Sequence, residues 1–101
     1  MYLIDTNVIS EKRKGYGANP GVIRFFKQAA ENNDRLYLSA MTIGELRRGV
    51  ELIRNRGNLS QARMLEMWLE VILVEYGDCI LDFNAAEAQV WGRFRHRVLK
   101  T

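Results

Sequence analysis

A short apolar segment that ends at an acid constrains this chain most. Tyr2, Leu3 and Ile4 are too few for a helix but enough for a buried strand, and Asp5 follows them directly. Ligands of open α/β sheets bind beyond the carboxyl ends of the strands, so we expect Asp5 to face a binding crevice. A structural alternative stays open, because an aspartate at this position also serves as an Asx-turn or N-cap residue.

Composition limits the kind of protein and the kind of metal site. The 101 residues fit one domain, and 48% hydrophobic and 27% charged residues are ordinary for a globular protein. No stretch is long and apolar enough to span a bilayer and no secretory leader is evident, so we expect a cytoplasmic protein without a membrane partner. One cysteine and one histidine exclude a zinc ligand set, so a metal would be held by oxygen. The net charge of +3 favours a nucleic-acid partner only weakly.

A second strand-to-helix junction supplies a second acid. Residues 36–38 are predicted to form a strand, and a helical apolar pattern follows with Glu45 in the first turn of the helix. Glu45 also fits structural roles, either in a capping box with Thr42 or in an ion pair with Arg48. Taken together with Asp5, however, it favours a metal site. Parallel strands deliver both carboxylates to one edge of the sheet, and Mg²⁺ or Mn²⁺ prefers oxygen ligands of this kind.

Two stretches closely resemble the PIN-domain toxins of VapBC-type toxin–antitoxin modules: MYLIDTNVIS at residues 1–10 and YLSAMTIGELRRGV at residues 37–50. The similarity implies an α/β, PIN-like, three-layer domain in which a short parallel sheet is flanked by helices. It also implies a Mg²⁺-dependent endoribonuclease, with Mn²⁺ as a possible substitute, that hydrolyses RNA and has an antitoxin protein as its partner. By this resemblance Asp5 and Glu45 are the catalytic metal ligands, and Thr6 and Asn7 support them.

The chain departs from that family in its last part. Family members continue with further strands and helices that carry other acidic ligands, and the next strand lies beside strand 1. We therefore expect residues 1–101 to form an incomplete domain that lacks the C-terminal strands, with the edge of residues 2–4 left unpaired. A site with two carboxylates would hold Mg²⁺ only weakly, so we expect this form to be inactive or nearly so.

Local signals place the other elements. Asn19 and Pro20 predict a helix start, and Ser60 is predicted to cap a long helix that reaches about Tyr76, where Gly77 stops it. Residues 79–81 with Phe83 read as a third strand, and Asn84 as the cap of a last helix. The residues of that last helix that are predicted to face inward are Ala88, Trp91, Phe94 and Val98. Its basic ridge is predicted to consist of Arg93, Arg97 and Lys100.

The long helix is apolar on more than one side. Its inward seam is predicted to consist of Ala62, Leu65, Leu69 and Ile72. Further apolar residues lie outside that seam, namely Met67, Trp68, Val71 and Val74. We expect a second subunit of a homodimer, or an antitoxin segment, to cover them, although core burial or a strand at residues 71–74 stays open.

Two functions of different classes remain. The first is a metal-dependent ribonuclease toxin with Asp5 and Glu45 at its centre. The alternative is an interaction module that is catalytically incomplete and that dimerises or binds an antitoxin through residues 67–74. A receiver-like phosphoacceptor would need an acidic pair near the first strand and a lysine late in the sheet, and neither is evident.

Overall fold

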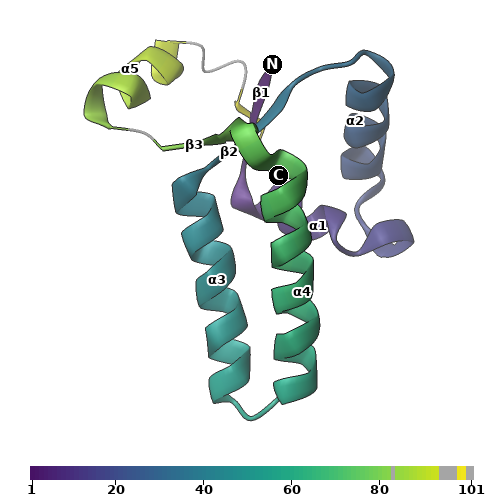
Figure 1. The fold of residues 1–101 in the computed structure, drawn as a ribbon. Helices are drawn as coiled ribbons and strands as arrows, with labels where there is room; N and C mark the ends of the chain where they lie inside the picture. The colour runs from purple at the N-terminus through teal and green to yellow at the C-terminus, as the bar shows by residue number, and fades with distance from the viewer. Residues whose placement is uncertain (83, 94–97, 100–101) are drawn as a thin grey trace.

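A small parallel sheet organises the structure, a computed structural model that describes residues 1–82, 84–93 and 98–99. Its strands lie in the order β3-β2-β1-β4, and every pairing is parallel (Figure 1). They are β1 (Tyr2–Ile4), β2 (Leu36–Ser39), β3 (Ile80–Leu81) and β4 (Val98–Leu99). The predicted α/β class with a short parallel sheet is confirmed.

Helices connect the strands, because parallel neighbours require crossover connections. They are α1 (Thr6–Lys12), α2 (Pro20–Glu31), α3 (Ala40–Asn55), α4 (Leu59–Tyr76) and α5 (Ala85–Arg93), with 3-10 turns at Gly15–Gly17 and Gly77–Cys79. α1 and α2 join β1 to β2. α3 and α4 join β2 to β3 and lie side by side as a long hairpin that extends away from the sheet (Figure 1).

Strand β4 corrects two predictions. Val98 was expected on the inward face of the last helix, but α5 ends at Arg93, and Val98 pairs with Leu3 while Leu99 pairs with Ile4. The edge of β1 is therefore paired, and a strand expected to be missing is present beside it. The reason is that an open strand edge offers unpaired backbone groups to a distant segment, a contact that helical spacing does not encode.

The predicted faces of the last helix are only partly described. Ala88 is exposed, so it does not face a core as expected. Phe83, Phe94, Arg97 and Lys100 lie outside the described residues.

Capping residues set the helix ends, and one of those described next lies at another position than expected. Asn19 Oδ1 accepts a hydrogen bond from the Gly21 amide at 2.8 Å, with Pro20 in the first turn, as predicted. Gly77 ends α4 with a φ of +36°, a conformation that favours glycine. Asn58 rather than Ser60 caps α4, and its Oδ1 accepts from the Gln61 amide at 3.2 Å.

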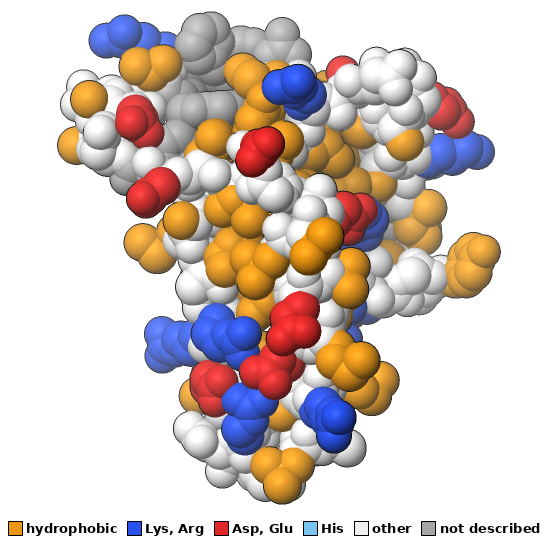
Figure 2. All heavy atoms as spheres, viewed as in Figure 1, with side chains coloured by type: hydrophobic (Ala, Val, Ile, Leu, Met, Phe, Trp, Pro, Cys, Tyr) orange, Lys and Arg blue, Asp and Glu red, His pale blue; other side chains and the backbone are white. Residues whose placement is uncertain are grey.

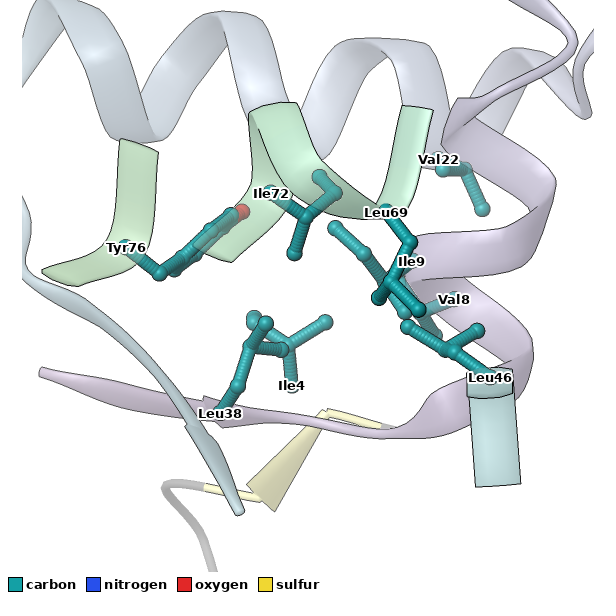
Figure 3. Close-up of a cluster of buried hydrophobic side chains, with 9 residues drawn as sticks. All are labelled: Ile4, Val8, Ile9, Val22, Leu38, Leu46, Leu69, Ile72 and Tyr76. Carbon is teal, nitrogen blue, oxygen red and sulfur yellow. The ribbon is translucent and has the colours of Figure 1, made fainter. Parts of the chain in front are cut away.

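The core lies between the two central strands and α4 (Figure 3). Ile4 and Leu38 are 1% and 0% exposed, and Leu69, Ile72 and Tyr76 of α4 belong to the same buried cluster. Burying one such aliphatic side chain contributes about 1.5–3 kcal/mol to folding. Burial also raises the pKa of the Tyr76 phenol to about 12, so this hydroxyl stays neutral in the core.

Charged side chains tie together the two helices of the α3–α4 hairpin. Glu66 of α4 accepts from Arg47 at 2.6 Å and pairs with Arg54 at 3.2 Å, and Arg54 also reaches Glu51 at 2.6 Å. Hydrogen bonds from Arg47, which has the larger effect, and from Arg54 lower the pKa of Glu66 below its usual value. Figure 2 shows acidic and basic side chains gathered on this hairpin. Solvent screens such pairs, so they orient the two helices more than they stabilise them.

A matched pair of leucines on α4 tests the core. Leu69 is 1% exposed and Leu59 is 65% exposed. We expect Leu69→Ala to lower the free energy of unfolding by about 2–5 kcal/mol, because it leaves a cavity, whereas Leu59→Ala changes it by about 0.5 kcal/mol or less. Urea denaturation followed by circular dichroism measures both, and equal losses would contradict the assigned core.

Candidate functional site

The two strand-to-helix junctions meet through hydroxyl groups. Thr6, the first residue of α1, has its Oγ1 3.0 Å from Thr42 Oγ1 and 3.1 Å from Glu45 Oε1, both on α3. A threonine hydroxyl has one proton and a carboxylate only accepts. We therefore assign that proton to Glu45, so that Thr6 Oγ1 accepts from the Thr42 hydroxyl. Thr42 is 5% exposed, which makes this contact the anchor of the junction.

Asp5 caps the helix that carries Thr6. Its backbone is extended, with φ −70° and ψ 151°, and its Oδ2 accepts from the Asn7 amide at 3.4 Å. The structural alternative for Asp5 therefore holds, since it is the N-cap residue of α1. The same position, directly after β1, lies at the carboxyl edge of the parallel sheet. Capping and ligand binding are compatible, because the described contacts use only one carboxylate oxygen.

Glu45 does not have the structural roles that its sequence context suggested. Ser39 is the N-cap of α3 and accepts from the Met41 amide at 3.0 Å, so Thr42 lies inside the helix and cannot form the capping box. The ion pairs found among the described residues do not include one between Glu45 and Arg48. Its described contact is instead the hydroxyl of Thr6, from the other junction.

The two supporting residues differ in what they do. Thr6 contacts Glu45 directly. Asn7 contributes its backbone amide to Asp5, while its side chain is exposed and has no hydrogen bond among the described residues. The structure thus brings together Thr6 and Glu45, with Asp5 next in the chain, and it leaves the Asn7 side chain outside.

A pocket of about 200 Å³ opens beside Glu45. α1 contributes Thr6 and Ser10 to its wall, and Arg13, the C-cap residue of α1, also lines it. α4 contributes Trp68, whose ring centroid lies 5.9 Å from the Arg13 guanidinium carbon. Asp5 is not among its lining residues. The remaining wall comes from Glu45, Leu46, Gly49, Val50, Ile53 and Leu65.

Sequence reasoning missed Thr42, Arg13 and Trp68 as parts of this site. A signal for Arg13 was present, because Thr6, Ser10 and Arg13 follow a spacing of four and three residues and so share one face of α1. Thr42 lies one turn before Glu45 on α3 in the same way. These spacings indicate a shared face, but only the packing of α1 against α3 shows that the faces meet.

The possible metal ligands are two carboxylates. Among the described residues, no group of three or more Asp, Glu, His or Cys side chains could hold a metal ion. A cation held by Asp5 and Glu45 would therefore keep several water ligands. Mg²⁺ commonly binds in this way, because it dehydrates reluctantly and uses one or two carboxylates.

Comparison with models of known families, with curated proteins and with solved structures gave no match to this chain. Within residues 1–82, 84–93 and 98–99, no helix has both the length and the apolar character that crossing a bilayer would need. A function is therefore assigned from the chemistry of the site residues.

The hydroxyl of Thr6 can be tested without an activity assay. We expect Thr6→Val to lower the free energy of unfolding by about 1–3 kcal/mol, because the Thr42 hydroxyl loses its described partner. Thr6→Ser keeps the hydroxyl and is expected to lose less. Urea denaturation of both variants measures the difference, and a Val variant as stable as the wild type would show that this contact does not anchor the junction.

Proposed function

We propose that this chain is a PIN-type, Mg²⁺-dependent endoribonuclease of a toxin–antitoxin module, with Asp5 and Glu45 as its metal ligands. The observation behind this is the contact of 3.1 Å between Thr6 Oγ1 and Glu45 Oε1. Because Thr6 directly follows Asp5, the two acids belong to adjoining strand-to-helix junctions of one parallel sheet. The carboxyl edge of such a sheet is where open α/β folds bind ligands.

The order of the strands adds support. In the PIN family the next strand lies beside strand 1, and β4 occupies that position here. This agreement is independent of the two motifs on which the resemblance rests, since residues 98–99 lie in neither.

The donor set fits a divalent cation. Asp5 Oδ2 and Glu45 Oε1 accept protein hydrogen bonds, so within the described contacts one oxygen of each carboxylate remains for Mg²⁺ or Mn²⁺. A bound ion would activate a water molecule and stabilise the charge of the scissile phosphodiester. The chain itself supplies orientation, because the Thr6 hydroxyl fixes Glu45 and the Asn7 amide fixes Asp5.

Arg13 gives the site a positive group. It lies in the wall of the same pocket as Glu45, and a guanidinium there would bind a phosphate oxygen of RNA. No protein nucleophile is required. Such an enzyme would meet RNA in the cytoplasm and would have an antitoxin as its protein partner.

Cleavage of a labelled RNA with Mg²⁺ or Mn²⁺ tests the metal site. We expect slow cleavage, because two acids hold a cation weakly, and we expect Asp5→Asn and Glu45→Gln each to reduce it by about a hundredfold. Glu31→Gln removes an exposed acid of α2 and is the matched control, with unchanged activity expected.

Calorimetric measurement of Mn²⁺ binding distinguishes an inactive enzyme that keeps its metal site from a protein that has no such site. The wild type is expected to bind the ion and both site variants to lose that binding. Cleavage that continues in EDTA, or that survives Asp5→Asn unchanged, would contradict the metal-ligand assignment.

A second candidate function is an interaction module that associates through α4. Four exposed residues of this helix lie three, four and three residues apart, which is the spacing of a coiled-coil seam. Met64 is 71% exposed, Met67 and Val71 are each 59% exposed, and Val74 is 83% exposed. Trp68, which was expected to join them, packs against the core instead, so this second seam is narrower than predicted.

The apolar seam is complementary to itself, which favours a second copy of the chain as its partner. In an antiparallel pair of α4 helices, Met64 of one copy lies opposite Val74 of the other, and Met67 lies opposite Val71. Each buried side chain would contribute about 1.5–3 kcal/mol before the cost of association, so a concentration-dependent dimer is expected.

Sedimentation equilibrium measures this association. We expect the wild type to dimerise with rising concentration and Val71→Glu to remain monomeric, because the seam would then bury a charge. Val90→Glu is the matched control, since Val90 is 49% exposed on α5, away from the seam. A wild type that stays monomeric at high concentration would contradict the proposal that a second copy of the chain covers the seam.

A further inference from the structure

The turn between α1 and α2 presents an aromatic ring that the fold does not use. Tyr16 is 106% exposed, as open as a tyrosine in an extended peptide. Gly15 and Gly17 flank it, and a Cβ added at either glycine would meet nothing within 4 Å. At that exposure, both faces of the Tyr16 ring are open to solvent. Exposure of this ring brings the folded state no burial energy, so stability does not explain it.

The residues before this ring are basic, and two of them contact aromatic rings rather than acids. Lys12 Nζ lies 4.5 Å from the Phe26 ring centroid, and Arg13 lies over Trp68 at 5.9 Å. Aromatic rings hold these cations in place without neutralising them. Among the ion pairs of the described residues, only Lys14 of this run has an acidic partner, Glu11 at 3.0 Å.

Arg13 connects this surface with the carboxylate site. It shares one pocket with Thr6 and Glu45, while Lys12, the residue before it, lines a second, mostly apolar pocket of about 250 Å³ together with Tyr16. Along α1, Arg13 lies about 12 Å beyond Asp5, at a rise of about 1.5 Å per residue. The capping acid Asp5, the cations Lys12 and Arg13 and the open ring of Tyr16 thus follow one another along α1 and the turn after it.

We propose that Lys12, Arg13 and Tyr16 form a platform for single-stranded RNA, with phosphates at the two cations and one unstacked base on the Tyr16 ring. Single strands are recognised by this combination, because every base has a face that stacks on an aromatic ring. A duplex keeps its bases stacked on each other and leaves none for Tyr16. The choice of RNA rests on the proposed ribonuclease function, whereas the stacking contact rests on the geometry of the turn.

Fluorescence anisotropy of a fluorescein-labelled oligouridylate measures this binding. EDTA is present throughout, so neither cleavage nor a metal ion contributes. We expect Tyr16→Ala to raise the Kd about tenfold and Tyr16→Phe to leave it unchanged, because Phe keeps the stacking face. A duplex RNA of equal length is expected to bind with no dependence on Tyr16. Tyr16 is fully exposed, so both variants should fold, and far-UV circular dichroism checks that they do.

The salt dependence of binding tests the cations. Arg13→Ala is expected to reduce the slope of log affinity against log salt by about 0.7, the value for one phosphate contact of a single strand. Arg56→Ala removes an equal charge where α3 ends, at the tip of the hairpin, and should leave the slope unchanged.

The outcomes separate the platform from the proposed enzyme. A folded Tyr16→Ala protein that binds oligouridylate as tightly as the wild type would overturn the platform. Equal loss in Tyr16→Ala and Tyr16→Phe would overturn stacking as its basis. Binding that depends on Tyr16 in a protein that neither cleaves RNA nor binds Mn²⁺ would uphold the platform and refute the metal-dependent ribonuclease.

Discussion

Burial of the two central strands under α4 is the interaction on which the rest of the structure depends. Ile4 of β1 and Leu38 of β2 are almost fully buried, and Leu69 and Ile72 of α4 share their cluster. Strands this short have few backbone hydrogen bonds, so packing of their side chains must hold them. The register, with Tyr2 opposite Leu36 and Leu3 opposite Tyr37, then brings both strand ends to one edge. Asp5 and the start of α3 emerge there as a consequence of the core.

Small polar residues make that shared edge a candidate site. A threonine at position 6 is short enough to lie between α1 and α3, and its hydroxyl satisfies both Thr42 and Glu45. Without such a bridge, an acid on an exposed helix would sample many rotamers, and binding a cation would carry the cost of ordering it. The hydroxyl contact fixes Glu45 beforehand, which is the form of preorganisation that a weakly held, hydrated ion requires.

Two helices present different residues to the core and to the surface. α4 contributes Leu69 and Ile72 to the core and exposes Met67 and Val71. α1 buries Val8 and Ile9, and the residues that follow them carry the cations that lead to Tyr16. A 3.6-residue period makes both arrangements possible in one helix, because an inward stripe leaves the opposite side free for other chemistry. The proposed metal ligands and the dimer seam thus use different residues, and Arg13 belongs both to the proposed RNA platform and to the pocket beside Glu45.

Some parts of this architecture follow from the sequence alone. The strand at residues 2–4, the helix start at Asn19 and Pro20 and the helix stop at Gly77 were predicted correctly, because each depends on a few adjacent residues. The pairing of Asp5 and Glu45 as candidate ligands also came from local pattern and family resemblance. The capping role expected for Thr42 beside Glu45 was not predicted correctly. Because β2 extends one residue further, to Ser39, that residue rather than Thr42 caps α3.

Tertiary structure decided the rest. That Thr42 is a buried hydrogen-bond partner and that Arg13 lies beside Glu45 follow from how α1 packs on α3, across more than thirty residues of chain. That Val98 lies in a strand follows from the open edge of β1. Periodicity and capping report interactions within a few residues, so they fix where elements begin and end. Which faces meet depends on contacts between distant segments, and those are determined only when the chain has folded.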